Sequence, residues 1–96
     1  MVIMMEEQTV YVFYDIEDDG IRNKVAETCK DYGLERIQFS GFSGFLNRNK
    51  REELFLKLSV VIEGKSAKIL ILPICDRDIK AKRELIQEIA DDSSQS

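Results

Sequence analysis

The clearest hydrophobic pattern in the chain runs through residues 9–16, where β-branched and aromatic side chains follow one another. The even-numbered side chains from Val10 to Tyr14 would face one side of a strand, and Tyr11 and Phe13 would face the other. Since both sides are apolar as far as the acidic end of the run, we expect a central strand.

Two segments carry apolar residues at helical spacing. The first begins near Gly20, after acidic residues that can cap a helix, and ends at Gly33, which can adopt the left-handed conformation. The second begins at Asn47 or Asn49 and stops at Gly64. The apolar stripes are Ile21, Val25, Ala26, Cys29 and Tyr32 in the first segment and Leu54, Leu58, Val61 and Ile62 in the second.

Three further strands are expected. Residues 36–39 alternate apolar and polar side chains, and two glycines then break the pattern, so a bend or bulge should precede a short third strand that begins at residues 45–46. Residues 67–75 are expected to form a buried strand. Because Pro73 cannot donate to a ladder, that strand should lie at a sheet edge there or stop pairing.

Residues 76–90 place Ile79, Ile86 and Ile89 at helical intervals, which predicts a third helix. The polar residues 91–96 are expected to form a disordered tail.

The order β-α-β-β-α-β predicts an α+β fold of the ferredoxin-like class, with one antiparallel sheet, two helices on one face and an appended C-terminal segment. A single domain over residues 1–90 is expected. The other sheet face would expose Tyr11 and Phe13, and a homodimer through this face is the simplest way to cover them.

The composition describes one globular domain, with 96 residues of which 44% are hydrophobic and 33% charged. No apolar run approaches the roughly 20 residues that span a membrane, and no signal peptide is recognisable, so a cytoplasmic location is expected. The absence of histidine excludes imidazole catalysis and His-ligated zinc. Cys29 and Cys75 lie far apart and are interpreted as buried thiols in a reducing cytosol.

The net charge of −4 is unevenly distributed. The first twenty residues carry six acidic and no basic side chains, whereas residues 21–57 carry eight basic and five acidic ones. The middle of the chain could therefore present a basic face to nucleic acid, and an ordinary mixed-charge surface explains the same counts equally well.

Asp15 is the first candidate for chemistry, because the apolar strand delivers it to its end, just before a turn and a helix. Without histidine, a metal-bound water is the natural nucleophile, and Mg²⁺ binds through one or two carboxylates. One Asp15 from each chain of a dimer would form such a site. The alternative is that Asp15 caps the turn without a metal. Asp18 and Asp19 are expected to be helix caps.

Two motifs resemble the small ferredoxin-like CRISPR-associated proteins of spacer acquisition, the partners of the CRISPR integrase. The first spans residues 14–26, with Tyr-Asp-Ile followed by an Asp-Asp pair and Arg-Asn-Lys-Val-Ala. The second spans residues 32–40 and is followed by Phe42 and a glycine. The apolar strand ending at residues 73–74 is similar to the family's last core strand, so the resemblance covers residues 9–75.

The resemblance implies a homodimer that binds nucleic acid, described in this family as a metal-dependent endonuclease of RNA or DNA and as a non-catalytic bridge between integrase dimers. It implies that the family's key aspartate, the catalytic and metal-binding residue, corresponds to Asp15. The cofactor expected there is Mg²⁺, and one ion shared by the two Asp15 residues of a dimer is the arrangement described above. The basic and aromatic neighbours that would contact nucleic acid map onto Tyr14, Arg22, Lys24, Arg36 and Phe42.

The residues themselves leave other roles open. The basic side chains could pair locally, for example with Glu27 or Glu35, or stay solvated, which is the favoured interpretation for Lys24. Packing in the core or the dimer interface is favoured for Phe42. The chain departs from the family at Gly41, where Val is usual and a looser bend is expected. Its C-terminal segment also looks more helical and more charged than the short dimer-swapped strand typical of the family.

Three functions compete. The first is a metal-dependent nuclease of the CRISPR acquisition system, and the second is a dimeric adaptor that binds duplex DNA and docks the integrase with Asp15 idle. The third is a single-stranded RNA-binding module, which residues 10–13 suggest. The spacing of Phe39, Phe42 and Phe45 does not match the second signature of an RNA recognition motif.

Overall fold

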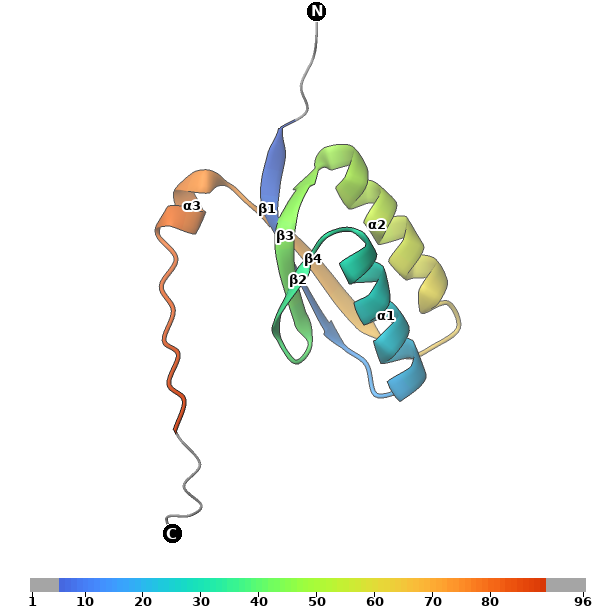
Figure 1. Cartoon of the computed structure of the whole chain (residues 1–96). Coiled ribbons are helices and arrows are strands. Elements are labelled where there is room, and N and C mark those ends of the chain that lie inside the picture. The colour runs from blue at the N-terminus through green and yellow to red at the C-terminus, as the bar shows by residue number, and fades with distance from the viewer. Residues whose placement is uncertain (1–5, 90–96) are drawn as a thin grey trace, which may run out of the picture.

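The structure is a computed structural model that describes residues 6–89. Four strands form one antiparallel sheet in the order β2-β3-β1-β4 (Figure 1). The sequence of elements confirms the predicted α+β order, with a short third helix added. The elements are β1 (Glu7–Asp15), α1 (Asp19–Asp31), β2 (Glu35–Gln38), β3 (Gly41–Asn47), α2 (Arg48–Val61), β4 (Lys68–Ile74) and α3 (Asp76–Lys80).

Strand β1 lies inside the sheet, between β3 and β4, as its apolar pattern predicts. Val10 and Val12 are completely buried and Tyr14 is nearly so, whereas the intervening Tyr11 and Phe13 are half-buried. This alternation places the even-numbered side chains against the helices and the odd-numbered ones on the opposite face. The sheet therefore has one face packed against the helices and one open face.

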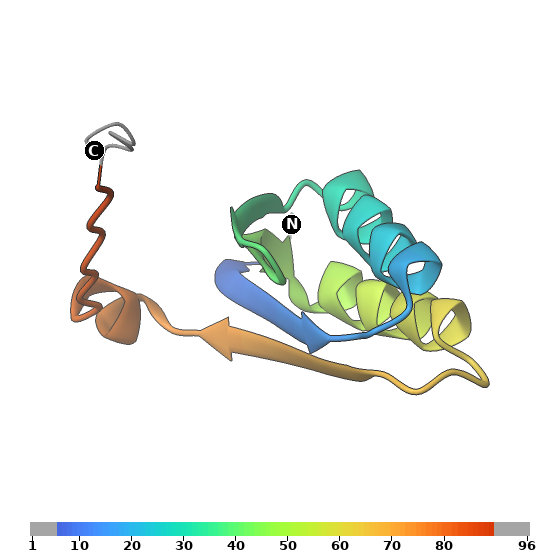
Figure 2. The ribbon, with the colours of Figure 1, turned by 90° about the horizontal axis from the view of Figure 1, so that it is seen from below.

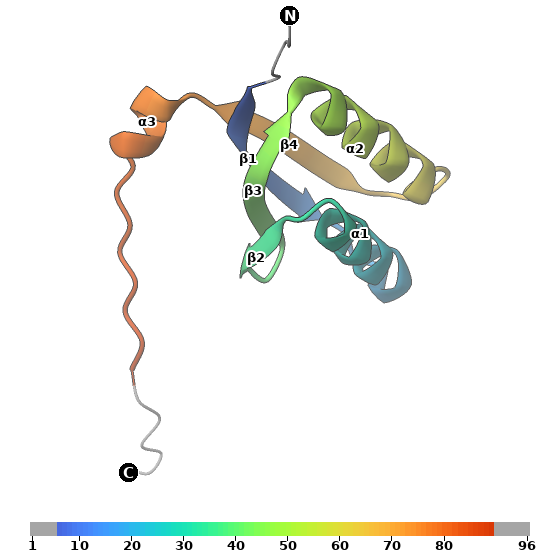
Figure 3. The ribbon, with the colours of Figure 1, turned by 45° about the horizontal axis from the view of Figure 1, so that its top comes forward.

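Helices α1 and α2 cover the packed face of the sheet side by side, which the turned views show clearly (Figures 2 and 3). Asn47 caps α2, since its side chain accepts a hydrogen bond from the Lys50 amide at 2.8 Å. Gly33 and Gly64 follow the two helices with φ of 83° and 75°, the left-handed conformation expected of helix-ending glycines. The predicted helix boundaries are confirmed.

The third strand begins earlier than the sequence suggests, at Gly41 rather than near residue 45. Gly44 lies within the strand. A glycine is needed there because a Cβ at this position would approach Leu34 Cδ2 to 2.7 Å. The irregularity lies instead in β2, where the register shifts between Arg36 and Gln38. The prediction that these glycines break the pattern was wrong, because close packing and not a bend requires them.

The third helix is much shorter than predicted, ending at Lys80, and the prediction of a helix to residue 90 was wrong. The chain from residue 81 to 89 has no helix or strand structure and runs away from the domain (Figure 1). Leu85, Ile86 and Ile89 are almost entirely exposed there. Within residues 6–89 these side chains find no surface to pack against, and a short unpacked helix is marginal in water. Residues 91–96, predicted to be disordered, lie outside the described residues.

The open sheet face carries a contiguous apolar patch. It consists of Tyr11 and Phe13, whose rings stack at 5.9 Å, and of the half-exposed Leu70 and Leu72 of β4. Lys82 lies at its margin, with Nζ 3.2 Å from the Tyr11 hydroxyl, and this hydrogen bond raises the pKa of the lysine. The face predicted to need cover is thus present and largely bare.

The two cysteines differ in environment. Cys29 is completely buried in α1, as predicted, and burial raises the pKa of its thiol to about 11. Cys75 is exposed, so the prediction that both thiols are buried was wrong for this residue. It follows β4 at the start of α3, beyond the cover that the helices give to the sheet. Across residues 6–89, the structure contains no helix with the length and apolarity that crossing a membrane requires.

Candidate active site

Asp15 lies at the C-terminal end of β1, exposed, between two buried neighbours, Tyr14 and Ile16. Its cross-strand partner in β4 is Lys68. Directly opposed residues of an antiparallel pair place their side chains on the same face, so both project from the open side of the sheet. Within residues 6–89 the Asp15 carboxylate makes no hydrogen bond and no ion pair. A rigid strand end thus presents a free carboxylate.

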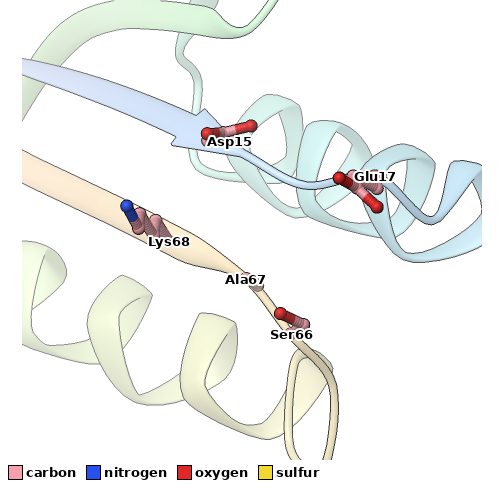
Figure 4. Close-up of a pocket in the computed structure, with 5 residues that line it drawn as sticks. All are labelled: Asp15, Glu17, Ser66, Ala67 and Lys68. Carbon is pink, nitrogen blue, oxygen red and sulfur yellow. The ribbon is translucent and has the colours of Figure 1, made fainter.

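A pocket of about 250 Å³ opens beside Asp15 (Figure 4). Glu17 from the β1–α1 loop lines it together with Ser66 and Ala67, which precede β4, and Lys68, the first residue of β4. The pocket therefore combines two carboxylates, one ammonium group and one hydroxyl. Asp15 was predicted as a site residue, whereas Lys68 was not, because the β1–β4 register that brings it opposite Asp15 cannot be read from a single strand. Glu17 was not predicted as a site residue either, although it lies only two residues after Asp15.

The next two acidic residues along the chain, Asp18 and Asp19, already have partners at the start of α1. The Asp18 carboxylate accepts a hydrogen bond from the Ile21 amide at 2.8 Å, which confirms its role as the N-cap of α1. Asp19, in the first helical turn, forms an ion pair with Arg22. Of the acidic residues from position 15 to 19, Asp15 and Glu17 are the two that line the pocket.

Asp15 and Glu17 supply carboxylate oxygens, the hard ligands that a divalent cation such as Mg²⁺ prefers. Within residues 6–89, no group of three or more side chains of the metal-ligating types is assembled. Mg²⁺ keeps several of its waters and can be held by one or two carboxylates, so the donor set fits this ion and is too small for an all-protein cage.

The two predicted arginines are engaged in the local structure. Arg22 donates to the carbonyl oxygen of Ile16 at 2.9 Å and lies over the Phe39 ring at 5.4 Å. Arg36 donates to the carbonyl oxygen of Phe39 and lies over the Phe42 ring at 4.9 Å. Neither pairs with Glu27 or Glu35, the partners considered from the sequence. Both guanidinium groups instead hold the β2–β3 turn.

The predicted aromatic contacts are core side chains. Phe42 is completely buried and Tyr14 is 6% exposed, and their rings stack at 6.3 Å. Within the described chain the Tyr14 hydroxyl is buried without a hydrogen-bond partner. Burial raises its pKa above the usual value, and the nearby positive charge of Arg36 opposes this shift. Direct contact of either ring with nucleic acid is not compatible with this packing, so the core role that the sequence favoured for Phe42 is confirmed.

Lys24 differs from the arginines. It is exposed on α1, and within residues 6–89 its side chain makes no hydrogen bond and no ion pair. Of the five residues predicted to contact nucleic acid, it is the one whose charged group makes no such contact within residues 6–89, since Arg36 is exposed but bonds the Phe39 carbonyl oxygen.

A sequence model described as CRISPR associated protein Cas2 matches residues 8–82. The chain belongs to the Cas2 family. It is 46% identical to a protein from Desulforudis audaxviator named CRISPR-associated endoribonuclease Cas2, over 77% of this chain and 70% of that protein. A protein of the same name from Korarchaeum cryptofilum is also 46% identical, over 79% of this chain and 82% of its own length.

Another relative, from Thermoproteus tenax, is named CRISPR-associated endonuclease Cas1/endonuclease Cas2 fusion. It is 39% identical over 73% of this chain, which corresponds to 26% of the fusion. In that protein a Cas2-like sequence is therefore covalently joined to a second endonuclease.

Solved structures agree with the Cas2 assignment. A crystal structure of a hypothetical protein from Thermus thermophilus aligns with a TM-score of 0.72 and 27% identity, covering 85% of this chain and 93% of that one. A structure titled as a crystal structure of Cas2 aligns with a TM-score of 0.57 and 30% identity, covering 84% and 99%. The ferredoxin-like fold and the family expected from the two motifs are both confirmed.

Proposed function

We propose that the chain is a metal-dependent endoribonuclease of CRISPR spacer acquisition, with Asp15 as the residue that binds the metal ion. The observation that carries this proposal is the free Asp15 carboxylate at a rigid strand end, in a pocket with Glu17 and Lys68. Two relatives that are 46% identical to the chain are named endoribonucleases, which supports the reaction class.

The pocket offers the chemistry that phosphodiester hydrolysis needs. Asp15 and Glu17 supply hard oxygen ligands suited to Mg²⁺. The chemistry that such an ion supplies when bound is the activation of water and the neutralisation of charge on the phosphate. The Lys68 ammonium on the adjacent strand would draw the phosphate to the pocket, since lysine acts as a point charge toward phosphate.

The active unit is a homodimer in this proposal. The apolar patch of the open sheet face would be covered by the same patch of a second copy, and Asp15 lies at the end of the strand that carries Tyr11 and Phe13. The second copy would bring another Asp15 toward a shared Mg²⁺, adding to a donor set that is small in one chain. The exposed apolar side chains of residues 85–89 would also pack against the partner.

The proposal is tested by cleavage of single-stranded RNA and duplex DNA with Mg²⁺ or with a chelator. Asp15→Asn is nearly isosteric and should fold and dimerise normally, yet lose metal-dependent cleavage by about 10²-fold or more, because a neutral amide is a poor metal ligand. Asp18→Asn is the matched control, since Asn caps a helix as well as Asp does, and it should retain activity. Equal cleavage by wild type and Asp15→Asn would refute the assignment.

A second candidate is a non-catalytic adaptor that binds duplex DNA and joins integrase subunits. The relative fused to Cas1 favours it, because fusion keeps two proteins together that work together. In that case wild type and Asp15→Asn would bind the integrase subunit and duplex DNA equally well, and neither would cleave any substrate above background.

A further inference from the structure

The two residues that flank Asp15 are both fastened from outside the strand. The Tyr14 amide donates to the Ser40 carbonyl oxygen at 3.1 Å, and the Ile16 carbonyl oxygen accepts from Arg22 at 2.9 Å. Both flanking side chains are also buried. Asp15 is therefore held on each side while its own carboxylate stays free.

Arg22 makes most of the contacts on the helix side of Asp15. One guanidinium nitrogen bonds the Ile16 carbonyl oxygen and lies 3.3 Å from that of Glu17, and the other pairs with Asp19. The face of the guanidinium group lies over the Phe39 ring of the β2–β3 turn. The side chain is only 24% exposed. A single residue of α1 thus ties the β1–α1 loop to the turn.

Arg36 of β2 contacts the same β2–β3 turn. It donates to the Phe39 carbonyl oxygen while its guanidinium group lies over the buried Phe42 ring. The Phe39 ring that receives Arg22 is 72% exposed, so the sheet does not hold it in place by burial. Both arginines therefore contact Phe39, Arg22 through the ring and Arg36 through the carbonyl oxygen.

We propose that Arg22 is a positioning residue, which fixes the β1–α1 loop that follows Asp15 and carries Glu17, and that it is not a phosphate ligand. The proposal rests on the proposed nuclease function for its catalytic consequence. To bind phosphate in a bidentate manner with both terminal nitrogens, Arg22 would have to give up bonds to the loop and its ion pair with Asp19. Preorganisation of reacting groups matters steeply, since a displacement of about 1 Å can cost on the order of 10²-fold in rate.

The test compares Arg22→Gln and Arg22→Lys with Lys24→Gln. Lys24→Gln removes the same charge from the same helix but touches neither the loop nor the turn. Three quantities are measured: backbone order parameters of residues 15–19 and 38–41 by ¹⁵N relaxation, the salt dependence of nucleic-acid binding, and kcat and KM for RNA cleavage.

For Arg22→Gln we expect loop order parameters to fall from about 0.85 toward 0.6, with an unchanged salt slope. Cleavage should lose about tenfold or more in kcat with KM within about twofold, the pattern of a lost positioning interaction. Arg22→Lys keeps the charge but loses the planar guanidinium group. It should therefore restore neither the loop order parameters nor kcat. Lys24→Gln should leave the loop ordered.

The opposite pattern would overturn the proposal. A phosphate ligand would leave the loop ordered in Arg22→Gln, flatten the salt slope by about one unit per lost contact, and be rescued by Arg22→Lys. If wild type has no cleavage activity, the nuclease proposal fails alone, because loop order and salt slope still decide the role of Arg22.

Discussion

Substitution of Leu70 by lysine tests whether the open sheet face is the dimer interface. Leu70 is 53% exposed on β4 beside the Phe13 ring. Full burial of a leucine contributes about 1.5–3 kcal/mol, so the exposed half is worth about 1 kcal/mol or slightly more in each chain. This free energy is lost twice in a two-fold interface, once for each chain. The introduced ammonium group must also be desolvated or displaced. The dissociation constant should therefore rise at least about 30-fold to 100-fold.

The matched control is Leu56→Lys, because Leu56 is 63% exposed on α2, in the helical layer on the other side of the sheet. Sedimentation velocity across micromolar concentrations should show a wild-type dimer, a dissociating Leu70→Lys and an unaffected Leu56→Lys, with unchanged far-UV circular dichroism in all three. A Leu56→Lys protein that dissociates while Leu70→Lys remains dimeric would place the interface on the helices.

Two further predictions concern buried groups. Tyr14→Phe should stabilise the fold by up to about 1–3 kcal/mol in urea denaturation, because the buried hydroxyl has no hydrogen-bond partner within residues 6–89. A loss of stability would contradict this. Unfolding should become easier between pH 9 and pH 11, by an amount on the order of 2–3 kcal/mol, because unfolded Cys29 ionises from about pH 9 while burial raises its folded pKa to about 11. A thiol reagent should modify only Cys75 in the native protein, and the alkaline fall should be smaller in Cys29→Ala.

The local elements were predictable where each residue's reason lies close in sequence. The alternation of β1, the stripe of α1, the Asn47 cap and the helix-ending Gly33 depend on neighbours within a few positions. Gly44 could not be interpreted this way, because its reason is the Leu34 side chain that packs over it. Likewise, the helical spacing of Ile79, Ile86 and Ile89 predicts a helix only if some surface receives it, and within residues 6–89 none does.

The site residues also differ in whether neighbouring sequence was enough to predict them. Asp15 was predictable because an apolar strand that ends in a carboxylate is a local pattern. Lys68 was not, because it reaches the pocket through the register of two strands more than fifty residues apart. The arginines were identified as important from the family motif, but the chemistry of a guanidinium group fits phosphate and carbonyl oxygen equally well. Only the contacts with Ile16 and Phe39 favour a structural role.

The same Leu70→Lys protein separates two views of the metal site. If the carboxylates of one chain suffice, a folded monomer should cleave RNA at the wild-type rate for each chain. If two Asp15 residues share one Mg²⁺, as we propose, activity should follow the dimer and rise with the square of protein concentration below the dissociation constant. A fully active Leu70→Lys monomer would show that Asp15 and Glu17 of one chain hold the ion unaided.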